Sequence, residues 1–152
     1  MTTFWRVVHF VAFVAWLGGG LAVMVAGIAM KRMDRSVWGA VVDVQSALYR
    51  WLLGPGSIVT VMTGLFLTFG MYGRLSGDVA AWLGTMQGAG LLAALVTLLG
   101  AMPAAARLTR LEPIGATAAA FDIARRRLAI TGSIAGLLGA VALLAGALYR
   151  FG

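Results

Sequence analysis

Residues 4–30 read FWRVVHFVAFVAWLGGGLAVMVAGIAM, an apolar run that only Arg6 and His9 interrupt. A helix needs roughly 20 such residues to cross a hydrocarbon core about 30 Å thick, so this run is long enough to span a membrane. It is also too long for the apolar core of a secretory signal, and more membrane-type sequence follows it. The run therefore predicts a transmembrane helix.

Three further apolar runs cover residues 51–73, 81–102 and 128–149. Backbone groups in lipid must be hydrogen-bonded within the structure, and the runs lack the period-two alternation of a membrane barrel. The predicted fold class is all-α, with residues 1–152 forming a single domain. That domain is an integral membrane bundle of four transmembrane helices.

The composition agrees with a membrane protein. Charged residues make up 11% of the chain, against about 25% in ordinary soluble domains. The mean hydropathy is +0.94. The absence of cysteine excludes disulfides, thiolate metal sites and covalent c-type haem. The net charge of +7 comes from basic residues at the ends of apolar runs, so we expect no nucleic-acid partner.

The basic residues also predict an orientation. Nine lie in the two long connections: Lys31, Arg32, Arg35, Arg50, Arg107, Arg110, Arg125, Arg126 and Arg127. Three lie on the other side: Arg6, Arg74 and Arg150. Because cytoplasmic loops carry the excess of Lys and Arg, the long connections should be cytoplasmic and both termini on the outer side. The expected location is the bacterial cytoplasmic (inner) membrane.

The long connections are themselves expected to be helical. One has apolar residues at helical spacing: Val37, Val41, Val44 and Leu48. This stripe predicts a helix from about Ser36 into the second span, with Gly54-Pro55-Gly56 as a kink or break. In the other connection, Pro113 is expected as the first residue of a helix that continues into the fourth span. Long helices should therefore extend into the cytoplasm.

Small residues predict where the helices pack, because close approach drives association in lipid. The fourth span has one stripe of Gly132, Gly136, Gly139, Leu143 and Gly146. The second has Gly56, Thr60, Thr63 and Gly70, and the third has Gly84-x-x-x-Gly88. We expect all three sets to face the bundle.

The only histidine, His9, is the first candidate binding residue. It lies just inside the predicted outer interface, and an imidazole there is costly without a partner. One interpretation makes it the axial ligand of a haem b iron, with Phe13 and Trp16 on the same face of the helix. The other makes it an interfacial side chain bonded to water, a headgroup or a helix carbonyl.

Met86 and Gln87 share the expected depth of His9. The Met86 thioether is a possible second haem ligand, and the Gln87 amide is a possible donor to a propionate or a quinone carbonyl. The alternative is that Met86 fills the core and Gln87 bonds to another helix. The sequence leaves both interpretations open.

Residues 9–19, HFVAFVAWLGG, resemble the first helix of a four-helix membrane superfamily. That superfamily includes the bacterial membrane protoporphyrinogen oxidase and the copper-resistance D proteins. Gly54-Pro55-Gly56 followed by Thr63-Gly64-Leu65 is similar to its second-helix pattern. The resemblance implies a first-helix histidine and a third-helix lysine at a haem. His9 matches the former, whereas Met86 or Gln87 stands where the lysine falls, so we expect a branch to which no reaction is assigned.

The sequence therefore predicts a non-catalytic accessory or structural subunit of a membrane complex, in contact with lipid and with other subunits or copies of itself. The alternative is a haem b-binding protein with His9 as its ligand. The basic run Arg125, Arg126 and Arg127 has two interpretations as well: simple anchoring at the headgroups, or binding of anionic lipid.

Overall fold

The computed structural model describes residues 2–69 and 77–151. The first helix, α1, spans Thr2–Met30. The second comprises a short 3-10 turn at Arg35–Val37, α2 (Trp38–Leu48), a π-helical turn at Tyr49–Leu53 and α3 (Gly54–Phe69). The third comprises α4 (Gly77–Val96), a π-helical turn at Thr97–Ala101 and α5 (Met102–Leu108). The fourth, α6, spans Ala118–Phe151.

These elements form a bundle of four long helices, and no strand occurs among the described residues. All four helices are long and apolar enough to cross a membrane. The predicted all-α class and the four-helix bundle are confirmed. The predicted second span extends to residue 73, and residues 70–73 lie outside the described part of the chain.

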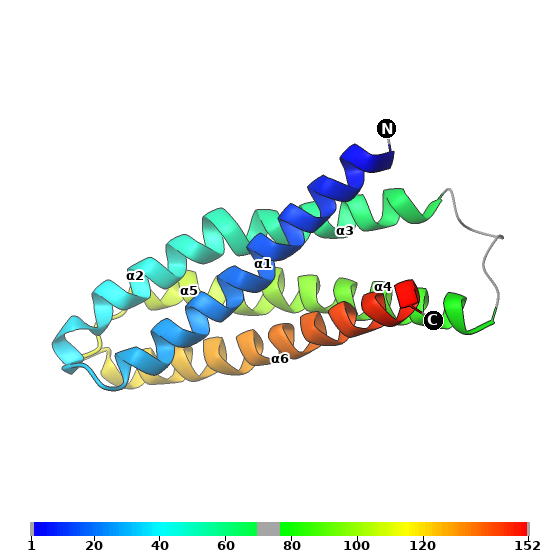
Figure 1. Cartoon of the computed structure of the whole chain (residues 1–152). Helices are drawn as coiled ribbons and strands as arrows, with labels where there is room; N and C mark the ends of the chain where they lie inside the picture. Colours follow the sequence, from blue (N-terminus) through cyan, green and yellow to red (C-terminus); the bar gives the residue numbers. More distant parts are fainter. Residues whose placement is uncertain (1, 70–76, 152) are drawn as a thin grey trace.

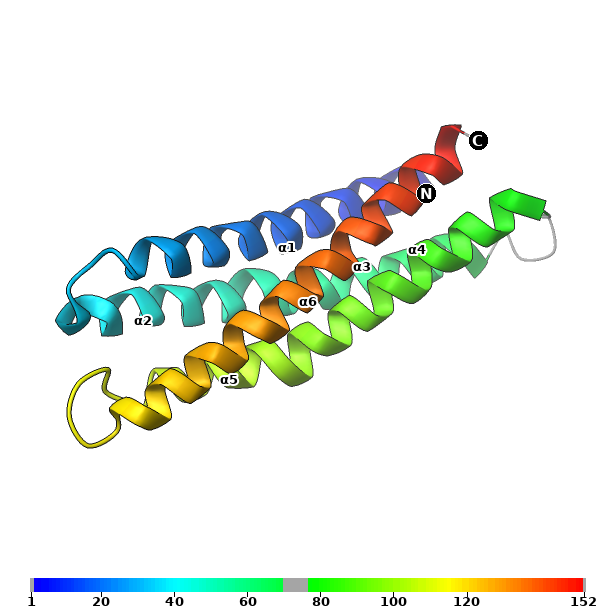
Figure 2. The ribbon, with the colours of Figure 1, turned by 90° about the horizontal axis from the view of Figure 1, so that it is seen from below.

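The bundle consists of two antiparallel pairs, α1 with α3 and α4 with α6 (Figure 1). The start of α1 and the end of α6 lie at one end, here called the terminus end. The loops 31–34 and 109–117 lie at the other, here called the loop end (Figure 2). The termini therefore share one end, as the predicted topology requires.

A kink or break was expected at Gly54-Pro55-Gly56, and the break is wrong, because the helix continues through these residues. The distortion is instead the π turn, which ends two residues before Pro55. A second π turn ends two residues before Pro103. Proline has no amide hydrogen for the carbonyl four residues earlier, and a widened turn accommodates the freed carbonyl. The second and third helices therefore each accommodate a proline through a π-helical turn and continue past it.

The buried face of α2 is offset by one residue from the apolar stripe, although Val41 and Leu48 of that stripe pack partly buried against the core. Val37 and Val44 are 46% and 57% exposed, whereas Val42 and Gln45 are buried. Trp38, one residue after Val37, packs against the core. Gln45 donates to the backbone carbonyl of Val23 at 2.9 Å, which fixes the rotation of the helix.

Pro113 is not the first residue of a helix, because α6 begins at Ala118. The loop before α6 turns at Gly115, whose φ of +88° favours glycine. The Thr117 hydroxyl closes this loop, since it accepts from the Glu112 amide at 2.8 Å. The long helical extension at the loop end is present, but it starts five residues later than expected.

The small-residue stripes are correct in part. A Cβ at Gly139 would lie 3.3 Å from Leu17, and one at Gly146 would lie 3.0 Å from Met86. Gly132 likewise faces the Tyr49 hydroxyl at 3.2 Å. Gly136, Gly84 and Gly88 have nothing within 4 Å, so the prediction that they pack against a helix is wrong. Leu143 is also exposed, and Gly70 lies outside the described residues.

Candidate functional site

His9 faces α3 at the terminus end of the bundle. Its Nδ1 lies 2.9 Å from the Thr63 hydroxyl oxygen. The single hydroxyl hydrogen of Thr63 is directed to the Val59 carbonyl, at 2.6 Å. The Thr63 oxygen can therefore accept from the imidazole in the tautomer that carries its hydrogen on Nδ1, and Nε2 is then an acceptor. His9 is half-buried, and its ring is oriented by the hydroxyl of a neighbouring helix.

A glycine makes room for this ring. A Cβ at Gly64 would lie 3.2 Å from Cε1 of His9 and 3.7 Å from its Nδ1. The imidazole would have to shift by a few tenths of an ångström to admit a side chain here. Two neighbouring residues of α3 thus position His9. Thr63 forms a hydrogen bond with the imidazole, and Gly64 lets the ring pack close to the helix backbone.

Gln87 is attached to the same stretch of α3 from the other side of the bundle. Its amide nitrogen donates to the Thr68 hydroxyl at 2.6 Å. Thr68 in turn donates to the Gly64 carbonyl at 2.7 Å. His9 and Gln87 therefore both bond to α3 next to Gly64, and neither bonds to the other.

Met86 faces a different neighbour. Its sulfur lies 3.0 Å from where a Cβ of Gly146 would be, so its side chain packs on α6. His9 packs on α3 instead. The predicted ligands His9 and Met86 thus contact different helices, α3 and α6.

Trp16 lies in the core. It is 6% exposed, and its indole nitrogen is 3.3 Å from the Thr97 hydroxyl, which donates to the Ala93 carbonyl at 2.8 Å. A Cβ at Gly56 would lie 3.1 Å from the Cβ of Trp16. Trp16 thus ties α1 to the π turn of the third helix and packs directly on α3.

Two features of the structure were missed by the sequence reasoning. The first is the buried Gln45, which bonds α2 to α1 through Val23. Its signal was a polar residue inside an apolar helical pattern. The second is the Thr60 hydroxyl, which is buried and has no hydrogen-bond partner among the described residues. The sequence carries no signal for that.

At the loop end, a cluster of charged side chains, here called the charged clasp, joins the segment before α2 to α6. Arg35 donates to Asp122 at 2.7 Å and also to the Pro113 carbonyl. The guanidinium groups of Arg35 and Arg125 lie 5.0 and 5.3 Å from the centre of the Trp38 ring. Arg125 approaches the same Asp122 carboxylate at 3.7 Å. The carboxylate of Asp122 and the indole of Trp38 are therefore each close to two arginines, one before α2 and one on α6.

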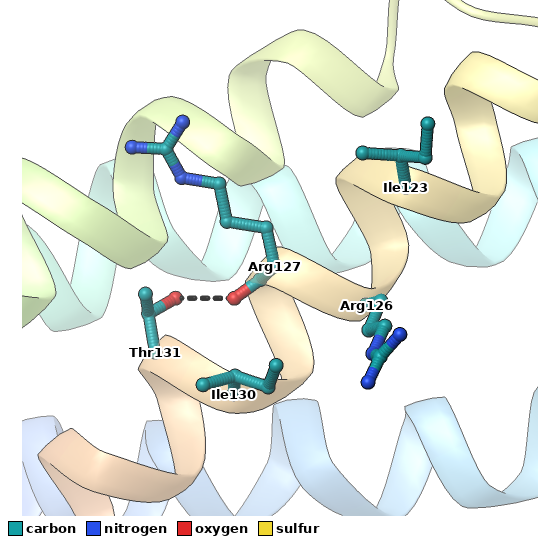
Figure 3. A pocket seen from close by; sticks show the side chains of 5 residues that line it. All are labelled: Ile123, Arg126, Arg127, Ile130 and Thr131. Carbon is teal, nitrogen blue, oxygen red and sulfur yellow. Dashed lines mark hydrogen bonds between the residues drawn. The ribbon is translucent and has the colours of Figure 1, made fainter.

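An open hollow of about 310 Å³ lies on α6 near the loop end (Figure 3). It is lined by Ile123, Arg126, Arg127, Ile130 and Thr131. These residues are three or four positions apart and so share one face of the helix. The hollow is at the opposite end of the bundle from His9.

Comparison with protein-family models, curated proteins and solved structures gives no match. The resemblance to the protoporphyrinogen oxidase superfamily therefore stays a prediction.

Proposed function

We propose that this chain is a multi-pass protein of the bacterial inner membrane that serves as a non-catalytic accessory or structural subunit. The observation behind this is how its intramembrane polar side chains are used. His9, Trp16 and Gln87 each bond to a neighbouring helix: to Thr63, Thr97 and Thr68. Polar side chains within membrane helices commonly mark a ligand or ion path. Here they serve as interhelical links, which suits a rigid scaffold.

The outer faces of the helices support contact with lipid and partner subunits. Several large apolar side chains there are more than 60% exposed: Phe10, Val14, Trp51, Leu137 and Leu144. An aqueous surface would not tolerate this much contiguous apolar area. In a membrane the same faces are available to acyl chains and to other helices.

The subunit role is tested by solubilising native membranes in a mild detergent and measuring the mass of the particle that contains this chain. We expect a particle of fixed stoichiometry, with a second membrane protein or with further copies of the chain. A single chain in its own micelle would contradict the proposal.

The proposed orientation places the loop end in the cytoplasm. Ser36 and Asp78 are exposed and lie at opposite ends of the bundle. In intact cells, a cysteine in Ser36→Cys should resist a membrane-impermeant thiol reagent, whereas one in Asp78→Cys should react. The reverse pattern would invert the topology, and because the chain has no native cysteine, the unsubstituted protein is the blank.

A haem b site at His9, for electron transfer or oxidase-like chemistry, is the second candidate function. One observation favours it: ligand histidines are usually oriented by a hydrogen bond from the other ring nitrogen, as Thr63 orients Nδ1 here. Nε2 would then be the nitrogen that binds iron. Met86 does not fit as the opposite ligand because it packs on Gly146. The iron would therefore be five-coordinate or take a ligand from another chain.

The visible absorption spectrum of the detergent-purified protein, before and after dithionite, separates the two candidates. A Soret band that disappears in His9→Ala but persists in Gln87→Ala would establish His9 as the ligand. A spectrum without a Soret band from protein purified with haem supplied would exclude this second candidate.

A further inference from the structure

The basic run at residues 125–127 is divided by the structure into two different environments. Arg125 is turned toward Trp38 and Asp122 and belongs to the clasp. Arg126 and Arg127 are exposed and line the hollow on α6. No ion pair involves either of them among residues 2–69 and 77–151. The hollow therefore carries two cations whose charge nothing described in the protein neutralises.

The walls of the hollow are apolar. Ile123 and Ile130 are 72% and 50% exposed. Thr131 adds no free donor, because its hydroxyl hydrogen is directed to the Arg127 carbonyl at 2.8 Å (Figure 3). In the same view the Arg126 and Arg127 side chains leave α6 in different directions, so the two cations flank the apolar surface. A ligand that fits must combine negative charge with a hydrocarbon part.

The place of the hollow along α6 matches the boundary of a membrane. The apolar run of the fourth helix begins at Leu128, directly after the two arginines. Guanidinium groups bind phosphate well and are held near the headgroups, while side chains one or two turns further along face acyl chains. Ile130 and the exposed Ile134 continue the apolar surface in that direction.

We propose that this hollow binds an anionic phospholipid, with the charged headgroup attracted by Arg126 and Arg127, which flank it, and an acyl chain along Ile130. The proposal rests on the membrane placement given above. Because the ligand is recognised by charge and by two arginines without a further polar donor, the site selects anionic over zwitterionic lipid. It does not select one anionic headgroup over another.

The test is lipid binding by the detergent-purified full chain, measured by native mass spectrometry in mixed micelles with phosphatidylglycerol or phosphatidylcholine. The wild type should retain phosphatidylglycerol preferentially, and raised ionic strength should weaken that preference. Arg126→Gln/Arg127→Gln should lower phosphatidylglycerol affinity roughly thirty-fold, since each basic residue near a membrane surface contributes about a factor of five.

The matched control is Arg107→Gln/Arg110→Gln, which removes the same charge from exposed positions near the loop end outside the hollow. It should keep nearly all of the affinity. An equal loss of phosphatidylglycerol affinity in both double variants would overturn the site, because the affinity would then depend only on the net charge of the protein. Equal retention of the two lipids by the wild type would overturn it without any variant.

Two further measurements separate the possible failures. Inorganic phosphate that competes as strongly as phosphatidylglycerol would show that the acyl chain contributes nothing, which contradicts a lipid site. Extraction of native membranes at alkaline pH tests the membrane placement itself. Release of the chain there would contradict the proposed function, whatever the purified protein binds in micelles.

Discussion

The two ends of the bundle are held together by different chemistry. Toward the terminus end, neutral side chains join the helices: His9 to Thr63 and Gln87 to Thr68. At the loop end, charged side chains do so, with Asp122 bonded to Arg35 and approached by Arg125. The Arg35–Asp122 pair joins segments far apart in the sequence, as the His9–Thr63 bond does, whereas the Arg125–Asp122 contact lies within α6.

The difference follows from the surroundings of each end. The terminus-end bonds lie within apolar helices, where a lone charge is expensive and a hydroxyl or amide bond is not. The loop-end clasp lies beside the polar loops, and its Arg35 and Asp122 side chains are 38% and 43% exposed. The change from neutral to charged links along the bundle therefore agrees with helices that pass from lipid into water.

The largest effect is expected where backbones approach most closely. A Cβ at Gly56 would lie 3.1 Å from the Ala12 carbonyl oxygen and 3.2 Å from the Trp16 amide nitrogen. Backbone atoms cannot move aside as a flexible side chain can, so Gly56→Leu must separate α1 from α3. We expect it to lower the free energy of unfolding by about 3 kcal/mol.

Gly136→Leu is the matched control, because nothing lies within 4 Å of that position. It should leave the unfolding midpoint in detergent nearly unchanged. If both leucine variants were equally unstable, the packing between α1 and α3 described here would be wrong.

The charged clasp should contribute less to the free energy of unfolding than the packing of α1 on α3. Asp122→Asn removes the carboxylate that Arg35 and Arg125 share. Since the pair is more than a third exposed, the expected loss is below about 1 kcal/mol and should shrink further with added salt. Unfolding of the purified protein at low and high ionic strength measures this, and a large loss that ignores salt would show that the clasp is not electrostatic.

The smallest effect is expected at Asp34, in the loop before α2. The Ser36 amide and hydroxyl both donate to its carboxylate at 3.1 Å, and these bonds lower the pKa of Asp34. Because the folded pKa is below the unfolded one, the carboxylate stabilises the fold above the unfolded pKa. That contribution is lost as the pH falls through the folded pKa. Asp34→Asn should remove a slight acid-dependent loss of stability, and a gain in acid sensitivity would contradict the assignment.

The sequence predicted the four helices well because apolar length is a strong signal that does not depend on tertiary contacts. It predicted helix rotation poorly. The Gly84–Gly88 pair of α4 has the right spacing for a packed face, yet nothing lies within 4 Å of either glycine. When both the core and the surroundings are apolar, however, hydrophobic periodicity cannot tell inside from outside. A polar residue such as Gln45, which the sequence reasoning missed, is the better guide, since a buried polar group needs a partner.

The candidate site shows the same limit. The sequence singled out His9, Trp16, Met86 and Gln87 as candidate binding residues, and three of them make interhelical hydrogen bonds. It placed Met86 and Gln87 at the depth of His9 and, in one interpretation, at the same haem. Depth along a helix does not determine which neighbour a side chain faces. Met86 turns to α6 and His9 to α3, so equal depth did not bring them together.

The central claim is that His9 serves as a link between helices, and a double-mutant cycle of His9→Ala and Thr63→Val tests it most directly. The free energy of unfolding of the four proteins is measured in the same detergent. Interhelical hydrogen bonds in membrane proteins contribute about 0.6 kcal/mol on average, so a favourable coupling energy of about that size is expected. Additive losses, with no coupling between the two positions, would contradict the claim.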